Sequence, residues 1–383
     1  MRGFWRMRNA GPAPLAGQWI GYADGTNTGL AIVELDDCGD ELRGHAYLFE
    51  GPETPGSLVP IRIPNGSTTI SFEAPVYPFD TRVSRVIGKP EFNDVFPDYN
   101  FPTKVDISLE LKRGSMQASW KTDLNTAGKS KLKGSNANKR SEYIANSNIK
   151  DWNDFKRLVS SIEPHKFMFR GQSVTARLRT SFHRTRRRDL LTFLNTDIPQ
   201  AHRVLTGQTK HVFRLNDPQE NGAFWNLLQH HGFPTPLLDW TQSPFVAAFF
   251  AYRFGAKRDS RDENIRIFMF DRAQWEADFR QLQSATLLPP HFSILEALTI
   301  ENSRALPQQA LSSVTNIDDI EDYIARKEQE SGNSYLDVID LPFSERRQVM
   351  RELSLMGITA GSLFPGLDGA CEELRGRFFG PVR

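Results

Sequence analysis

The hydrophobic pattern of this 383-residue chain changes near its middle. In residues 15–122, apolar residues form short alternating runs, such as residues 30–35 and 105–111, separated by Gly, Pro, Asn and Asp. This pattern predicts an antiparallel β-barrel or sandwich. In residues 151–383, apolar residues recur at helical spacing between strand-like runs, which predicts a mixed α+β or α/β domain. Since the chain is also longer than one ordinary core supports, we expect two domains.

Residues 123–150 are expected to link these domains. The hydrophobic pattern weakens there, and Lys, Asn, Ser and Gly become frequent, which is typical of a linker. The linker is basic and could contact nucleic acid, but a solvated hinge is the simpler interpretation. Its basic residues include Lys129, Lys131, Lys133, Lys139 and Arg140.

Composition limits the classes of protein and partner. The formal net charge of +1 excludes electrostatic attraction of the whole chain to nucleic acid as its main mode of binding. Cys38 and Cys371 are far apart in sequence and provide neither a disulfide framework nor a Cys-based zinc site. No stretch has the length of a signal peptide or a membrane helix. We therefore expect a cytoplasmic protein without a membrane partner.

The tetrapeptide Phe169-Arg170-Gly171-Gln172 ends a predicted strand that begins near residue 166. A guanidinium can bind a phosphate or carboxylate through two hydrogen bonds, and a glycine leaves room for a ligand to approach the backbone. This combination is suited to an anionic nucleotide. The alternative is an arginine that pairs with a buried acid at the end of a strand.

Residues 229–251 combine polar residues with an apolar helix. The helix is predicted to start after Ser243, because serine is a good N-cap and Pro244 suits the first helical position. It is nearly all apolar and should be buried. Polar residues that precede it, such as Asp239 and Thr241, would need hydrogen-bond partners at core depth, as in the wall of a ligand site.

Three kinds of chemistry compete for this run. A metal site would use His230, His231 and Asp239, but adjacent histidines seldom point at one ion, so no metal is expected. A hydrolase would use Ser243, but the Gly-x-Ser-x-Gly sequence is absent. A nucleotide site would place the polar residues beside Arg170. Because the Gly-rich loops of Rossmann and P-loop proteins are also absent, a nucleotide would be bound in another way.

Residues 183–188 form the densest basic cluster, with arginine at positions 184, 186, 187 and 188. Such a cluster could line a groove that binds phosphates. A solvated helix face is the alternative.

These segments, in this order, resemble the FRG domain family, which is named after its Phe-Arg-Gly motif. The resemblance covers about residues 151–374 and leaves the N-terminal β domain outside it. It departs from the family pattern at Pro236, where arginine is usual, so any anion contact of that arginine is missing here. The matching segments are residues 169–172, 178–184, 229–251 and 363–369, together with Arg304, Gln308 and Gln309.

A more distant resemblance is to mono-ADP-ribosyltransferases, in which an Arg-Gly strand is followed by a Ser/Thr-x-Ser segment and an apolar helix. Here Arg170-Gly171 and Thr241-Gln242-Ser243 are similar. The resemblance implies that Arg170 holds the pyrophosphate or ribose of NAD, that Gly171 binds the nicotinamide amide, and that Thr241 and Ser243 order the site. The expected cofactor-binding residues are Arg170, Gly171, Gln172, Arg184, His230, His231, Asp239, Trp240, Thr241 and Ser243.

The glutamate that such transferases use is missing from its expected place. Gln309 stands where the acid should be, and a glutamine cannot act as a base. Glu296, Glu301 and Glu345 are substitutes without a motif. The expected catalytic residues are Arg170, Thr241, Gln309 and Glu301.

The resemblance thus implies a nucleotide-dependent transferase or NAD-consuming effector of ADP-ribosyltransferase type, a bacterial toxin or a defence effector. A protein or a nucleic acid would be the acceptor, and the N-terminal β domain would sense a ligand or select the target. The alternative is a non-enzymatic FRG module that binds nucleic acid or a nucleotide through Arg170, Arg184, Arg186 and Arg187.

Overall fold

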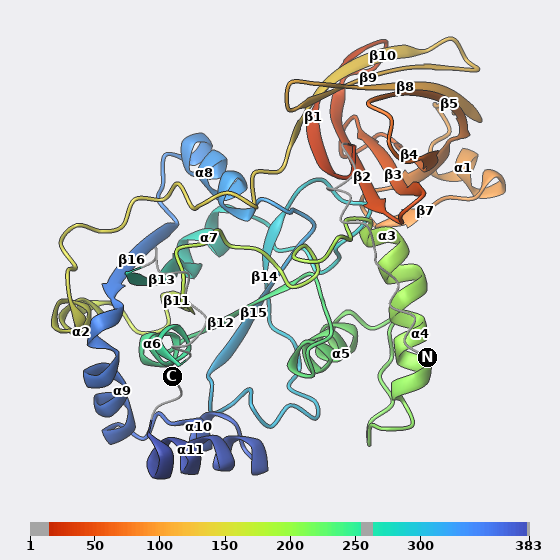
Figure 1. Ribbon diagram of the computed structural model, residues 1–383. Coiled ribbons are helices and arrows are strands. Elements are labelled where there is room, and N and C mark those ends of the chain that lie inside the picture. The colour runs from red at the N-terminus through yellow and green to blue at the C-terminus, as the bar shows by residue number, and fades with distance from the viewer. Residues whose placement is uncertain (1–14, 254–262, 381–383) are drawn as a thin grey trace, which may run out of the picture. The chain divides into compact units, whose positions relative to one another are not determined.

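The computed structural model describes residues 15–253 and 263–380, which divide into two compact units (Figure 1). The first unit contains the residues up to Ser135 together with residues 183–200 and 286–289. The second contains the remainder. No helix in these two described ranges is long and apolar enough to cross a membrane.

The first unit is built on one ten-stranded antiparallel sheet in the order β5-β8-β9-β10-β1-β2-β3-β4-β6-β7. The predicted antiparallel architecture is confirmed. Among the described strands, however, β5 and β7 remain sheet edges, so the sheet is not a closed barrel. Its elements are β1 (Gly17–Gly25), β2 (Gly29–Asp37), β3 (Glu41–Phe49), β4 (Gly56–Pro64), β5 (Thr69–Pro75), β6 (Tyr77–Asp80), β7 (Arg85–Val86), α1 (Lys89–Val95), β8 (Lys104–Lys112), β9 (Ser115–Thr122) and β10 (Ala127–Gly134).

The sheet folds over so that one of its faces encloses an apolar core. Side chains alternate between the two faces of a strand, and on β2 the residues Val33 and Leu35 point into this core. Ile61 of β4 and Leu109 of β8 pack in the same core, although their strands lie far apart in the sheet order. The opposite ends of the sheet are therefore brought together by apolar packing.

The other face of the sheet is covered by a segment from later in the chain. Ile32 and Tyr47 pack there with Leu191 and Leu287. Leu191 belongs to α3 (Leu190–Thr192), which continues into the π-helix η1 (Phe193–Asp197). The sequence predicts residues 151–383 as one domain, but this part joins the first unit because the apolar face of the sheet needs a cover.

Part of the predicted linker is a strand. Residues 127–134 form β10, which pairs with both β1 and β9. Ser130 and Leu132 are buried, whereas Lys129, Lys131 and Lys133 are exposed. The exposed lysines give the segment the composition of a linker, although its alternation with a period of two is that of a strand with one buried face.

The second unit contains a six-stranded sheet in the order β14-β15-β12-β11-β13-β16, in which every neighbouring pair is antiparallel. The unit is therefore of the α+β type rather than the parallel α/β type. Its strands are β11 (Phe167–Gln172), β12 (Leu237–Thr241), β13 (Asn264–Asp271), β14 (Phe292–Leu295), β15 (Ala310–Thr315) and β16 (Leu336–Pro342). Its helices are α2 (Trp152–Ser161), α5 (Pro218–His230), α6 (Pro244–Tyr252), α7 (Arg272–Asp278), α8 (Ile320–Ser331), α9 (Arg346–Leu355), α10 (Ala360–Leu363) and α11 (Leu367–Phe379), with a 3-10 turn, η2 (Phe343–Glu345). Helix α4 (Ile198–Leu205) begins in the first unit and ends in the second.

Helices cover both faces of this sheet. On β13, Ile265 and Ile267 pack with α2, α6 and α9. Phe268 and Phe270 point to the other face and pack with α7 and α8. Strand β11 lies inside the sheet, between β12 and β13, and its pairing with β13 continues to its last residue, Gln172.

Candidate functional site

Strands β11 and β12 pair through Phe169 and Thr241. If this antiparallel ladder continued, Gly171 would lie opposite Asp239, but that pair is not formed. Strand β11 stays paired with β13 as far as Gln172. The sheet therefore opens between β11 and β12 directly after Phe169, at the predicted Arg170 site.

Arg170 lies at this opening. Its Nη1 atom donates a hydrogen bond of 2.6 Å to the main-chain carbonyl oxygen of Asp239. In a continued ladder, a backbone amide of the neighbouring strand would donate to the Asp239 carbonyl. Here the Arg170 guanidinium donates to it instead. The Asp239 side chain is exposed. This contact is therefore not the pairing with a buried acid that was the alternative interpretation of Arg170.

Gly171 is explained by packing. Helix α6 lies against β11 (Figure 1). A Cβ atom on Gly171 would lie 1.8 Å from the carbonyl oxygen of Ala247 and 2.9 Å from the amide nitrogen of Ala251. The space that a side chain would need is filled by the α6 backbone, so the glycine allows the helix to approach the strand. Its predicted contact with a ligand stays a prediction.

Gln172 has an unused hydrogen-bond donor. Its Nε2 atom is buried and has no hydrogen-bond partner within the described part of the chain. Nearly all buried polar groups in proteins find a partner. Side chains two residues apart on a strand point to the same face, so Arg170 and Gln172 present donors on one side of β11.

Gln229 holds the side chain of Asp239. Its Nε2 atom donates to the Asp239 carboxylate, and its Oε1 atom accepts from the hydroxyls of Thr235 and Ser181. Sequence reasoning placed Gln229 at the start of the run but did not assign it to the site. Its position in the last turn of α5, ten residues before Asp239, carries no signal of this contact.

Thr241, Ser243 and Trp240 make structural contacts. The Thr241 hydroxyl donates to the carbonyl oxygen of Gln308 at 2.7 Å and accepts from the Ser243 amide at 3.0 Å. The Ser243 hydroxyl accepts from the Val246 amide and caps α6, as predicted. Trp240 is buried, and its Nε1 atom donates to Ser313. In this structure both hydroxyls stabilise the connection from β12 to α6, and the indole joins β12 to β15.

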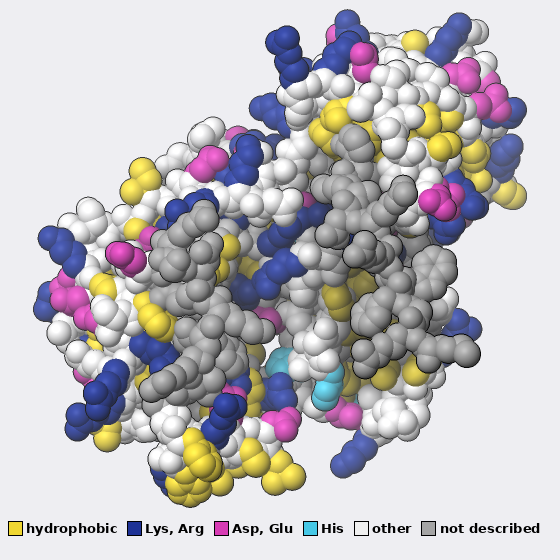
Figure 2. Space-filling model, in the orientation of Figure 1, with side chains coloured by type: hydrophobic (Ala, Val, Ile, Leu, Met, Phe, Trp, Pro, Cys, Tyr) yellow, Lys and Arg dark blue, Asp and Glu magenta, His cyan; other side chains and the backbone are white. Residues whose placement is uncertain are grey.

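The two histidines lie at the end of α5. His230 Nδ1 lies 2.9 Å from the carbonyl oxygen of Asn226, one helical turn earlier. His231 follows the helix and is exposed. Figure 2 shows histidine side chains beside basic and acidic ones on one face of the second unit. Across the described residues, no group of three or more His, Cys, Asp or Glu side chains could hold a metal ion.

The expected catalytic acids have other partners. Glu301 accepts a hydrogen bond from the His211 amide, and Glu296 forms an ion pair with Arg272. Glu345 accepts from the amide of Trp152, and burial raises its pKa. Gln309 has an exposed side chain, and its backbone has a φ of 46°. None of these contacts involves Arg170, whose bond to Asp239 goes to the main-chain carbonyl and not to the carboxylate.

The basic cluster belongs to the first unit and is not a helix. Residues 183–186 form turns, residues 187 and 188 are irregular, and Arg184 and Arg186 are exposed. Arg187 forms ion pairs with Asp36 at 2.5 Å and Asp197 at 2.9 Å. The prediction of a solvated helix face is therefore wrong, and the charge of Arg187 is used within the protein. The cause is the buried carboxylate of Asp36, which needs a partner.

Two buried ion pairs were missed by sequence reasoning. Arg179 contacts both carboxylate oxygens of Asp318, and Arg177 contacts both of Asp319. All four residues are at most 9% exposed. Their separation by about 140 positions in sequence leaves no local signal, but they fix the segment after β11 to the start of α8.

The fold and this site define the second unit as an α+β domain with a central antiparallel sheet that opens beside an arginine. Residues 165–260 match the family model of the FRG domain. The match contains β11, α5, β12 and α6, and it supports the predicted resemblance to the FRG family. No curated protein and no solved structure matches the chain, and the likeness to ADP-ribosyltransferases receives no support from these comparisons.

Proposed function

We propose that the second unit binds NAD at the opening between β11 and β12 and consumes it as a transferase of ADP-ribosyltransferase type. The observation that carries this proposal is the buried Nε2 atom of Gln172, which lacks a partner in the described residues, two positions after Arg170. A buried donor on the same strand face as a guanidinium is suited to a ligand that has both acceptor oxygens and negative charge. The phosphates, ribose hydroxyls and carboxamide of NAD meet this requirement.

Asp239 is the acid that we assign to the reaction. Transfer breaks the bond between the nicotinamide nitrogen and C1′ of the ribose, and the bonding electrons leave with nicotinamide. Positive charge then develops on the sugar, which a nearby carboxylate stabilises. The same carboxylate can accept the proton of the attacking hydroxyl group. Gln229 restrains the Asp239 side chain. In this proposal Asp239 takes the role of the missing glutamate, for which the sequence analysis named Glu301.

Labelled NAD, incubated with the full chain and mixed protein, DNA and RNA acceptors, tests this proposal. Nicotinamide release and label transfer are measured for the wild type and for Asp239→Asn, Gln172→Ala and Arg170→Ala. We expect Asp239→Asn to lose turnover while it retains binding, and the other two to bind NAD more weakly. Arg157→Ala, which removes an exposed arginine on α2, is the matched control. The enzymatic proposal fails if the wild type produces no more nicotinamide or labelled product than Arg170→Ala.

The rival function is non-enzymatic binding of nucleic acid through the arginines. Exposed Arg184 and Arg186 favour it, whereas the ion pairs of Arg187 with Asp36 and Asp197 count against it. Phosphate contacts release counterions, so binding through them weakens steeply with salt. A salt titration of DNA and RNA binding with a slope near zero would reject this function.

A further inference from the structure

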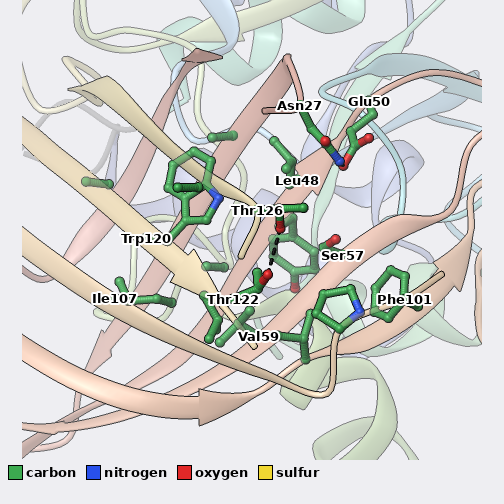
Figure 3. Close-up of a pocket in the computed structure, with 18 of the residues that line it drawn as sticks. Asn27, Leu48, Glu50, Ser57, Val59, Phe101, Ile107, Trp120, Thr122 and Thr126 are labelled. Carbon is green, nitrogen blue, oxygen red and sulfur yellow. Dashed lines mark hydrogen bonds between the residues drawn. The ribbon is translucent and has the colours of Figure 1, made fainter. Parts of the chain in front are cut away.

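The folded-over sheet of the first unit encloses an apolar cavity of about 150 Å³. Its walls come from strands far apart in the sheet order (Figure 3). Leu48 and Val59 lie on β3 and β4, and Ile107 and Trp120 lie on β8 and β9. These side chains belong to or pack against the main apolar core of the unit. The core therefore surrounds a space rather than filling it.

The cavity has a polar end. Asn27, Glu50, Thr122 and Thr126 line it where β2 begins, β3 and β9 end and β10 begins. In Figure 3 Asn27 and Glu50 lie together, and the hydroxyls of Thr122 and Thr126 contact each other at 2.7 Å. The remaining walls are mostly aliphatic and aromatic. The space thus has a group of hydrogen-bonding side chains at this end and mostly apolar walls elsewhere.

Glu50 is the charged group of this polar end. Its Oε1 atom accepts a hydrogen bond of 2.8 Å from Asn27 Nδ2. For Oε2 the described part of the chain offers no hydrogen-bond partner. Burial raises the pKa of the Glu50 carboxyl, and the bond from Asn27 lowers it in part. A carboxylate that has lost part of its hydration gains from a further donor.

The wall beside Trp120 is fixed by a glycine on the neighbouring strand. Gly128 pairs with Trp120, and a Cβ atom on Gly128 would lie 2.5 Å from the indole ring. The ring therefore lies across the backbone of β10, and packing limits its movement. A cavity with such a wall stays open to a ligand of matching shape.

We propose that this cavity binds a small molecule with one aromatic ring or a short alkyl body and one hydrogen-bond donor group, whose donor lies at Glu50. A cavity of this volume has room for a molecule about the size of benzene. The polar end then selects among such molecules, as the few polar groups of an apolar ligand site usually do. This inference does not depend on the NAD proposal, since every residue involved belongs to the first unit.

Isothermal titration of the full chain with benzylamine, benzyl alcohol and toluene tests the inference. We expect saturable binding, with benzylamine or benzyl alcohol roughly tenfold tighter than toluene, because a hydrogen bond to a charged group contributes to affinity. Glu50→Gln should reduce benzylamine affinity roughly tenfold and leave toluene unchanged. Glu53→Gln, an exposed acid in the same loop, is its control.

Filling the cavity provides an independent test. Ala118 lines the cavity, whereas Ser119 is exposed on the same strand. Ala118→Phe should abolish binding of all three probes, and Ser119→Phe should not change it. If Ala118→Phe does not fold, the comparison of Glu50→Gln with Glu53→Gln still tests the inference. The inference is overturned if no probe saturates, if toluene binds as tightly as both donors, or if folded Ala118→Phe binds like the wild type.

Discussion

The guanidinium of Arg170 donates to the main-chain carbonyl of Asp239 at the point where β11 and β12 stop pairing. One side chain thereby closes a gap in a sheet ladder and places a positive charge at an opening. The neighbouring Asp239 carboxylate is exposed and held by Gln229. This relationship joins the stability of the sheet to the proposed site, so the two roles of Arg170 must be separated by experiment.

Arg170→Ala should lower the free energy of unfolding by about 2 kcal/mol, because the Asp239 carbonyl loses a charged hydrogen-bond donor. Chemical denaturation of the full chain measures this. Arg157→Ala should change it by less than about 0.5 kcal/mol, since Arg157 is exposed. Equal stability of Arg170→Ala and the wild type would contradict the contact with Asp239.

Gly171→Ala should be severely destabilising. The added Cβ atom would meet the carbonyl oxygen of Ala247 at 1.8 Å, so α6 must move away from β11. Overpacking of this kind costs about 3 kcal/mol or more. The matched change is Gly207→Ala, where a Cβ atom has nothing within 4 Å. If the thermal unfolding midpoint of Gly171→Ala falls as little as that of Gly207→Ala, α6 does not approach β11 this closely.

Asp318→Ala should cost about 3 to 5 kcal/mol, because it leaves the buried guanidinium of Arg179 without its charged partner. Asp322→Ala removes the partner of Arg326 from a pair in which both side chains are about half exposed. That change should cost less than about 1 kcal/mol. Urea unfolding curves compare the two, and similar losses would argue that Asp318 is solvated.

Glu34→Gln should stabilise the protein at neutral pH. Burial raises the pKa of Glu34 well above its ordinary value of 4.5, and the nearby carboxylates of Asp189 and Asp36 act in the same direction. The unfolded chain releases this proton at a lower pH than the folded chain does. Wild-type stability therefore falls as the pH rises from about 4.5 to the folded pKa.

The comparison of Glu34→Gln with the wild type is made by thermal unfolding between pH 4 and pH 8. The stability of the variant relative to the wild type should increase as the pH rises, and the two should be equally stable near pH 4. Gln18 can still donate to the amide oxygen at position 34, as it does to Glu34 at 2.8 Å. Glu53→Gln, which changes an exposed acid, should show no such trend. A gain of Glu34→Gln that is independent of pH would contradict a raised pKa.

Much of the fold follows from local patterns. The alternation on β2, the cap at Ser243 and the strand that contains Phe169 were all predicted from nearby residues. Such features depend on the period of side chains and on the backbone groups at helix ends. The strand β10 was missed because lysines on its exposed face give it the composition of a linker.

The candidate site was less predictable. Sequence reasoning selected Arg170 and Asp239, which the structure joins. It also selected Thr241 and Ser243, whose hydroxyls bond the protein itself. Gln229 escaped notice, because the direction of a side chain across ten residues of turn and strand has no local signature. The motif therefore identified the region of the site, but not which of its polar atoms remain available to bind a ligand.

The sequence by itself determined the two kinds of structure, the FRG-like segment and the polar residues that gather near α6, because periodicity and residue chemistry are local properties. Only the tertiary structure decided that the sheet opens after Phe169, that Gly171 accommodates a helix, and that residues 183–200 belong to the first unit. Each of these depends on which surfaces far apart in the chain bury one another. Which surfaces pack together depends on the whole core, so it cannot be inferred from any single segment.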